Sequence, residues 1–263
     1  MYQTTYHKAT SADDAVAKLG SAEDGMVLAG GQTLIPTMKQ RLAAPSDVID
    51  LSGAGLSGVS VDGATVTIGA MTTHAEVANN ADVLRVIPSL ACLAAGIGDP
   101  AVRHKGTIGG SVANNDPAAD YPAALLALGA TIVTSSREVA ADDFFTGMFS
   151  TDLDEGEIIT AVKVTAPERG AYAKFPNPAS RYAMAGVFVA KTGDGIRVAV
   201  TGAGEDGVFR HDGMEAALAA NFAPDAVDGV DVAEDGLLSD IHGDARYRAN
   251  LVKVMAKRAV AAA

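Results

Sequence analysis

The hydrophobic pattern of the first fifty residues predicts alternating helices and strands. Ser11 stands before a helical pattern that runs to about Leu19 and can cap it, with two acidic residues in the first turn. Two short apolar runs, residues 26–28 and 47–51, are predicted strands. A glycine pair and a predicted helix over about residues 33–42 lie between them. Residues 26–51 are therefore predicted to form a strand, glycine loop, helix and strand.

The middle of the chain continues this mixed pattern. Residues 59–61 and 65–68 alternate around Asp62-Gly63, which predicts a hairpin. Thr73 and Glu76 form a capping box for a short helix. Further helices are predicted at 88–95 and 121–128, and a strand at 130–134. Residues 98–120 are rich in Gly, Asn and Asp and are predicted to be irregular, and an irregular loop of this length is usually functional.

The second half predicts strands first and helices at the end. Residues 151–157 are an acidic loop, and strands are predicted at 158–164, 185–190 and 196–200. Two helices follow at about 213–221 and 245–261. Because strands and helices do not alternate regularly, we predict an α+β fold and not a doubly wound sheet. The run Pro176-Asn177-Pro178 predicts a boundary between two domains, residues 1–175 and residues 176–263.

Composition narrows the class of protein. The chain has 263 residues, 48% of them hydrophobic, which suits a globular protein of one or two domains. Its net charge of −12 and pI of about 4.7 argue against nucleic-acid binding. No run of about 18 apolar residues is present, so no membrane span is predicted. The N-terminus lacks the pattern of a signal peptide, which predicts a cytoplasmic location.

A single cysteine, Cys92, excludes a disulfide within the chain. It also excludes a cysteine-based zinc site or iron–sulfur cluster, since these need about four ligands that are mostly Cys. Cys92 lies in the apolar run 90–94, so its thiol is predicted to be buried and structural. The five histidines lack the spacing of a metal site, and no metal site is predicted.

Two segments match the dinucleotide fingerprint only by letter. Residues 53–58 lead into the predicted hairpin and not into a helix, so no helix dipole faces a phosphate there. In residues 202–207 the acidic pair Glu205-Asp206 would repel a phosphate. Both segments are interpreted as turns, and no Walker A motif is present.

Two other glycine segments carry better chemistry for a phosphate. The first glycine loop, residues 29–34, lies between a strand and a helix, so its backbone can approach a ligand closely and Thr33 can donate a hydroxyl. The second glycine segment, residues 106–111, offers backbone donors with Thr and Ser hydroxyls. Each alone can equally be a tight turn. Together they can hold one diphosphate from two sides, which suits a dinucleotide such as FAD. Polar side chains suited to a ribose follow at Asn114, Asn115, Asp116 and Asp120.

These segments resemble the FAD-binding flavoprotein subunits of molybdenum hydroxylases, and within them the carbon monoxide dehydrogenase group. The resemblance rests on both glycine segments and continues, in order, through most of the chain. The other matching stretches are residues 68–74, 99–103, 116–122, Lys174 and 180–185. One departure is Thr33, where the family usually has Ser. The hydroxyl is kept, so phosphate binding is expected to persist. A short C-terminal region is the other departure and bears on subunit contacts.

The resemblance implies a two-subdomain FAD-binding domain, similar to the PCMH/VAO type, followed by a smaller α+β domain. It implies that the first glycine loop holds the pyrophosphate from one side and residues 107–111 from the other, with Ile108 near the flavin ring. Asp120 would bond the ribose, the backbone of Ile159 would meet the adenine, and Lys174 and Tyr182 would lie near the flavin. The implied FAD residues are Ala29, Gly30, Gly31, Gln32, Thr33, Leu34, Thr107, Ile108, Gly109, Gly110, Ser111, Asp120, Ile159, Lys174 and Tyr182. No catalytic residue is implied on this chain.

The resemblance also implies an electron-transfer role within a larger complex. An iron–sulfur small subunit with 2Fe-2S clusters and a large subunit with the molybdenum cofactor would be the partners, as a dimer of heterotrimers. Two alternatives stay open at this point: a self-contained FAD-dependent oxidoreductase, and a scaffold that has lost its flavin. The sequence leaves the substrate open, and also the electron acceptor, a quinone or NAD.

Overall fold

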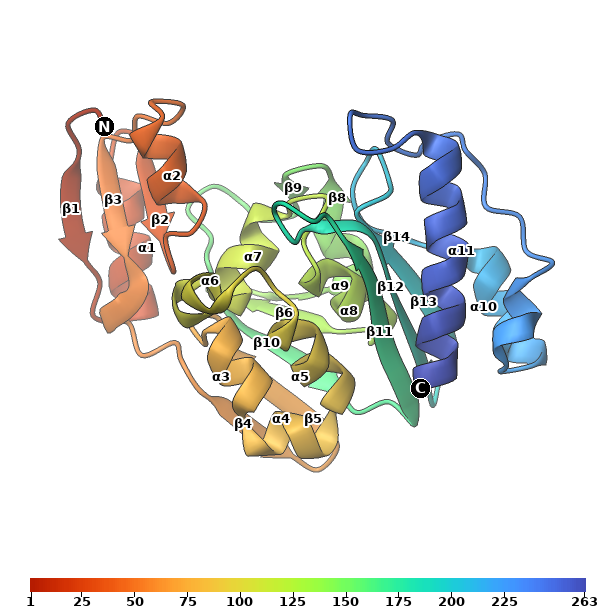
Figure 1. Cartoon of the computed structure of the whole chain (residues 1–263). Coiled ribbons are helices and arrows are strands. Elements are labelled where there is room, and N and C mark those ends of the chain that lie inside the picture. The colour runs from red at the N-terminus through yellow and green to blue at the C-terminus, as the bar shows by residue number, and fades with distance from the viewer.

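The computed structural model describes residues 1–263, and its sheets divide the chain into three lobes that follow one another in sequence (Figure 1). The N-terminal lobe holds a parallel sheet in the order β1-β3-β2. Its elements are β1 (Thr5–Lys8), α1 (Ala12–Ser21), β2 (Gly25–Leu28), α2 (Leu34–Lys39), β3 (Asp47–Asp50) and the 3-10 turn η1 (Leu51–Gly53). Ser11 caps α1 as predicted, since its side chain accepts from the Asp14 N–H. The core of this lobe is a cluster of six buried residues, one of which, Ile158, comes from the segment just before β10 (Ile159–Thr165).

The central lobe is an antiparallel five-stranded sheet in the order β4-β5-β10-β6-β7. Its strands are β4 (Val59–Asp62), β5 (Thr65–Gly69), β6 (Thr131–Thr134), β7 (Glu138–Ala140) and β10 (Ile159–Thr165). Its helices are α3 (His74–Asn79), α4 (Ala81–Val86), α5 (Pro88–Ala95), α6 (Pro100–Lys105), α7 (Ile108–Asn114), α8 (Tyr121–Ala127) and α9 (Ala141–Phe144), and a small hairpin pairs β8 (Phe145–Gly147) with β9 (Ser150–Thr151). The predicted capping box of Thr73 and Glu76 is present on α3. The largest hydrophobic core of the protein lies in this lobe.

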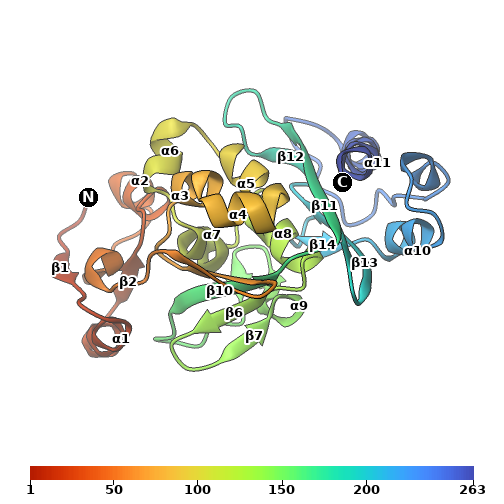
Figure 2. The same ribbon diagram turned by 90° about the horizontal axis from the view of Figure 1, so that it is seen from below.

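The C-terminal lobe is a four-stranded antiparallel sheet in sequential order. Its elements are β11 (Arg169–Pro176), β12 (Ala183–Thr192), β13 (Gly195–Thr201), β14 (Phe209–Arg210), α10 (Asp212–Ala220), the 3-10 turn η2 (Pro224–Val227) and α11 (Ala245–Ala262). The first eight residues of β12 are buried, because α8 packs on one face of the sheet and α11 on the other (Figure 2). Successive β12 side chains therefore belong to different cores. Phe188 packs in the core of the central lobe, and Val187 packs in the core under α11.

The three sheets confirm the predicted α+β class. The predicted boundary after residue 175 falls within the β11–β12 hairpin, where all of β11 pairs with β12. The division into two domains stays a prediction, and the sheet pairing favours residues 166–168, between β10 and β11, as its position.

The prediction of an irregular segment over residues 98–120 is wrong, because α6 and α7 lie within it. Asp99 caps α6 with Pro100 at its first position, and Thr107 caps α7 by accepting from the Gly110 N–H. Glycines lower helix propensity, which is why the pattern at 106–110 did not predict a helix. Packing explains the glycine at position 109, because a Cβ on Gly109 would lie 2.5 Å from the Ala70 Cβ.

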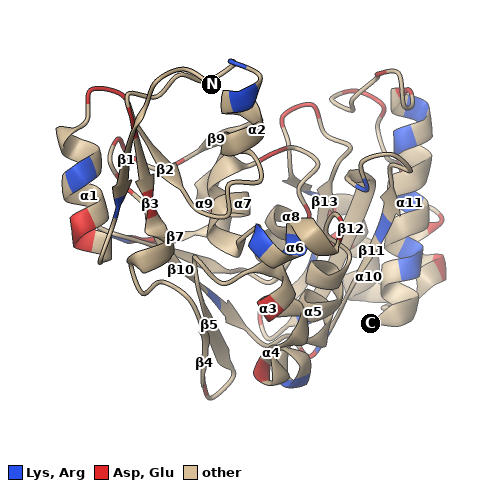
Figure 3. Ribbon diagram, turned by 60° about the vertical axis from the view of Figure 1, so that its left-hand side comes forward, with Lys and Arg blue, Asp and Glu red and all other residues tan.

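Two further features concern the surface. The prediction that Cys92 is buried is wrong, because it lies on the exposed side of α5 while Leu90, Ala91 and Leu93 are buried. Basic side chains follow α11, and acidic residues occupy many of the loops (Figure 3). None of the helices combines the length and the apolar character needed to cross a membrane.

Candidate functional site

A cavity of about 670 Å³ lies where the three lobes meet. Its walls come from the first glycine loop, from α7 and from the turn between β11 and β12. The structure brings all but two of the predicted residues to this cavity, namely Ala29, Gly30, Gly31, Gln32, Thr33, Leu34, Thr107, Gly109, Gly110, Ser111, Asp120, Ile159 and Tyr182. The two exceptions are Ile108, whose side chain is fully buried in the central core, and Lys174. The volume falls within the range of about 300–1,000 Å³ that is typical of small-molecule sites.

The first glycine loop presents unpaired backbone donors. The N–H groups of residues 30–33 have no acceptor in the protein, and the next bond is from the Ile35 N–H to the Gly31 carbonyl. Gly31 has a φ of +69°, which favours glycine, and Gly30 packs directly on the α6–α7 connection. Four successive N–H groups without an acceptor, in a loop that lines the cavity just before a helix, can supply donors to a phosphate.

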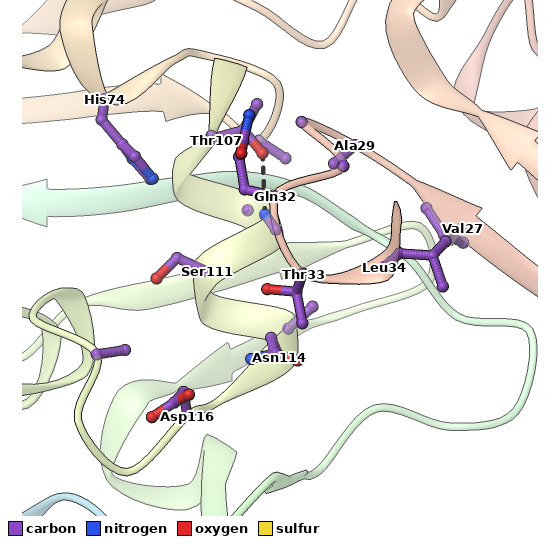
Figure 4. A pocket seen from close by; sticks show the side chains of 18 of the residues that line it. Val27, Ala29, Gln32, Thr33, Leu34, His74, Thr107, Ser111, Asn114 and Asp116 are labelled. Carbon is purple, nitrogen blue, oxygen red and sulfur yellow. Dashed lines mark hydrogen bonds between the residues drawn. The ribbon is translucent and has the colours of Figure 1, made fainter. Parts of the chain in front are cut away.

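The second glycine segment uses its donors differently from the prediction. The N–H groups of residues 108–111 already bond to Thr72, Ala70 and Thr107, so of the expected backbone donors only the Thr107 N–H has no acceptor in the protein. What this segment offers is the hydroxyl of Ser111, which has no partner and lines the cavity. In Figure 4, Thr33 of the first glycine loop lies beside the helix that carries Ser111 and Asn114, with His74 toward one end and Asp116 toward the other.

Asp120 forms a buried pair below the cavity. Its carboxylate accepts from the Tyr172 hydroxyl and pairs with Lys174 Nζ at 3.0 Å, and Lys174 also donates to the Gly96 carbonyl. The Asp120 and Lys174 side chains are only 5% and 10% exposed. Burial raises the pKa of Asp120, while Lys174 and Tyr172 act in the opposite direction. Asp120 therefore ties the start of α8 to β11, and its role toward a ribose stays a prediction.

Of the polar residues expected to meet a ribose, one has a different role. Asn115 is buried, ends α7 with a φ of +41° and donates to the carbonyls of Gly147 and Ser150, so it does not line the cavity. Asn114 and Asp116 do line it. Burial raises the pKa of Asp116, and its carboxylate accepts from the Ala118 N–H.

Glu157 closes another edge of the cavity, beside Ile158 and Ile159. Its side chain is 3% exposed and accepts from Arg137, Ser136 and Thr134. Burial alone would raise the pKa of Glu157, but these hydrogen bonds outweigh it and lower the pKa from 4.5 to about 2. Glu157 is therefore ionised and holds the start of β10 to the β6–β7 turn.

This geometry predicts an acid-dependent contribution to stability. Because the folded pKa is depressed, the contribution is present above pH 4.5 and is lost as the pH falls toward 2. We expect Glu157→Gln to lower the free energy of unfolding at pH 7 by about 1–3 kcal/mol. The difference from the wild type should narrow steadily between pH 4.5 and pH 2 in urea titrations. A difference that stays constant over this range would contradict the assignment.

The sequence did not point to several residues of the cavity. His74, Met71, Ile97, Val102 and Leu153 line it, together with Arg181, whose guanidinium bonds to the Gly98 carbonyl. His74 and Met71 lie in the stretch 68–74 that resembles the family, and Val102 and Arg181 lie in the stretches 99–103 and 180–185, but the resemblance gave none of them a role. Ile97 and Leu153 are apolar residues that only the folded chain brings to the cavity.

Free backbone donors on one wall, with the unpaired Ser111 hydroxyl and the Asp116 carboxylate on the other, fit a dinucleotide that contains phosphate. The fold and the cavity thus define a dinucleotide-binding domain of mixed α and β structure. The family of FAD binding domains in molybdopterin dehydrogenase matches residues 2–167. The chain belongs to this family, as the curated relatives also indicate.

Two relatives and one solved structure illustrate the similarity. The nicotine 6-hydroxylase medium subunit of Paenarthrobacter nicotinovorans is 35% identical, over 97% of this chain and 95% of the relative. The carbon monoxide dehydrogenase medium chain of Hydrogenophaga pseudoflava is 36% identical, over 98% and 96%. The structure of reconstituted CO dehydrogenase from Oligotropha carboxidovorans superposes with a TM-score of 0.91 at 34% identity, covering 99% of this chain and 97% of that one. The predicted family is thereby confirmed.

Proposed function

We propose that this chain is the flavin-carrying electron-transfer subunit of a molybdenum hydroxylase complex. It would hold FAD in the cavity and pass electrons from a partner iron–sulfur subunit to an external acceptor. The observation that carries the proposal is the first glycine loop. Its N–H groups at residues 30–33 have no acceptor in the protein, and the loop lines a cavity walled by α7 in a chain of the FAD-binding family. When bound, FAD supplies the redox chemistry, and the protein supplies binding and orientation.

The residues of this chain would divide that task between the two ends of the cofactor. The first glycine loop and Thr33 would hold the diphosphate, with the Ser111 hydroxyl facing it from α7. Tyr182 is half exposed at the mouth of the cavity and would lie against the flavin. The Asp120–Lys174 pair would form part of the cavity floor, with Asp120 lining the cavity and Lys174 behind it.

The single cysteine of this chain and the medium-subunit relatives together support partner subunits. One cysteine cannot hold an iron–sulfur cluster, so the clusters would belong to a small subunit and the molybdenum cofactor to a large one. We propose a dimer of such heterotrimers, located in the cytoplasm. The relatives named for nicotine and for carbon monoxide are nearly equally identical to this chain, at 35% and 36%. Substrate recognition would accordingly belong to the large subunit.

The experiment compares the complete complex with the isolated FAD-loaded chain, both kept free of oxygen. Carbon monoxide, nicotine and an aldehyde are added in turn while the visible flavin absorption is recorded. One of them is expected to bleach the flavin in the complex, and none should bleach it in the isolated chain. Bleaching of the isolated chain by a substrate would instead establish a self-contained oxidoreductase. A complex whose molybdenum centre is reduced while its flavin stays oxidised would overturn the electron-transfer role.

A further inference from the structure

His74 is a buried imidazole without a hydrogen-bond partner in the protein. It is the first residue of α3, its side chain lines the cavity, and it is 5% exposed. Nδ1 is shielded from solvent and unpaired, and no protein group bonds to the other ring nitrogen. Leaving a buried polar group unpaired costs about 1–3 kcal/mol. A group outside the protein is therefore expected to meet this ring.

The orientation of the ring identifies the nitrogen that faces the cavity. A Cβ built on Gly106 would lie 2.6 Å from His74 Nε2 and 2.8 Å from Cδ2, so this edge of the ring lies against Gly106. Gly106 itself lines the cavity next to the first glycine loop, because Gly30 packs on it. Figure 4 shows the ring directed toward the side of α7 that carries Ser111. Nε2 is thus the nitrogen nearest to a ligand held between the two glycine segments.

The surroundings of His74 keep it uncharged. Burial, with a smaller contribution from the nearby Arg103 guanidinium, lowers the pKa of His74 from 6.5 to about 4. At neutral pH the ring therefore offers one N–H donor and one acceptor nitrogen. The Tyr121 ring lies 5.4 Å away, and its hydroxyl is also buried and unpaired, but Tyr121 does not line the cavity.

We propose that His74 is a binding residue for the dinucleotide and that its Nε2–H donates a hydrogen bond to an oxygen of the ligand beside Gly106. This inference rests on the proposed function, since the ligand is taken to be FAD. A neutral donor at this point fixes the position of the phosphate or sugar chain without adding a charge. This bond gives the ring its one polar contact, at Nε2, while Nδ1 stays shielded and unpaired.

Three variants of the full chain separate this role from a packing role. His74→Phe keeps an aromatic ring but has no donor, His74→Gln keeps an N–H donor of similar reach, and Tyr121→Phe removes the neighbouring unpaired hydroxyl. We expect His74→Phe to raise the dissociation constant for FAD about tenfold, which corresponds to about 1.4 kcal/mol. His74→Gln should stay within about threefold of the wild type, and Tyr121→Phe should be unchanged. The flavin-free His74→Phe chain should unfold at the same or a higher urea concentration, because it buries no unpaired nitrogen.

A measurement on the wild-type chain tests the same hydrogen bond without relying on a variant that folds. With ¹⁵N-labelled histidine, the Nε2 resonance of His74, assigned by its loss in His74→Gln, should shift when FAD saturates the chain. An unmoved resonance, or FAD binding by His74→Phe as tight as in the wild type, would overturn the proposal. If the wild type itself binds no FAD, the proposed function fails and not only the role of His74.

Discussion

Gly30→Ala is expected to weaken FAD binding by at least about 100-fold, or about 2.7 kcal/mol. A Cβ at this position would lie 2.0 Å from the Lys105 carbonyl oxygen and 2.7 Å from the Gly106 Cα. Both neighbours are backbone atoms that cannot rotate away, so the first glycine loop would have to move off the α6–α7 connection. Its unpaired N–H groups would then be displaced from the cavity wall opposite α7.

The matched control is Gly20→Ala in the same lobe. Gly20 lies within α1 and has no atom near an added Cβ, so the change should leave FAD affinity unaltered and stabilise the helix by up to about 1 kcal/mol. Both variants are titrated with FAD by flavin fluorescence. Wild-type affinity in a folded Gly30→Ala chain would remove the first glycine loop from the site.

Asp120→Ala is expected to lower the free energy of unfolding by about 3–5 kcal/mol. The variant leaves the Lys174 ammonium buried without its carboxylate and removes the acceptor of the Tyr172 hydroxyl. Because β11 carries both partners and α8 carries Asp120, the loss also loosens the C-terminal lobe from the cavity floor. Urea denaturation of the flavin-free chain measures the effect.

Asp228→Ala supplies the comparison for an exposed ion pair. Asp228 pairs with Lys257 at the surface, where such pairs contribute about 0–1 kcal/mol. We therefore expect Asp120→Ala to lower the free energy of unfolding several-fold more than Asp228→Ala does. Equal effects would mean that the buried pair does not hold the two lobes together.

Local patterns predicted those parts of the fold that neighbouring residues decide. Ser11, the capping box at Thr73 and the Asp62-Gly63 hairpin all appear where the sequence placed them. The failures share a different cause. β1 and β11 were not predicted, because they are strands through the partners they pair with, and the short alternation of Ala171, Ala173 and Phe175 in β11 did not single it out. The α7 helix forms in spite of its glycines because Thr107 caps it and Ala70 packs against it.

In the candidate site, too, the features set by neighbouring residues could be predicted and those set by distant contacts could not. The glycine segments were visible in the sequence because a short motif carries their chemistry. The contact of Asp120 with Tyr172 and Lys174 joins residues 52 and 54 positions apart, so only the folded chain reveals that Asp120 is already paired. His74 could not be singled out, since its significance lies in burial without a partner. The free donors of residues 30–33 and the occupied donors of 108–111 likewise become distinguishable only when their acceptors are known.

We expect the full chain to bind one FAD in the cavity through the first glycine loop. Equilibrium titration of the flavin-free wild-type chain with FAD tests it most directly, with ADP as a competitor for the diphosphate contacts. The titration should saturate at one FAD per chain with a dissociation constant of about 1 μM or below. ADP should displace the bound FAD at higher concentration. A folded chain that shows no saturable FAD binding would contradict it.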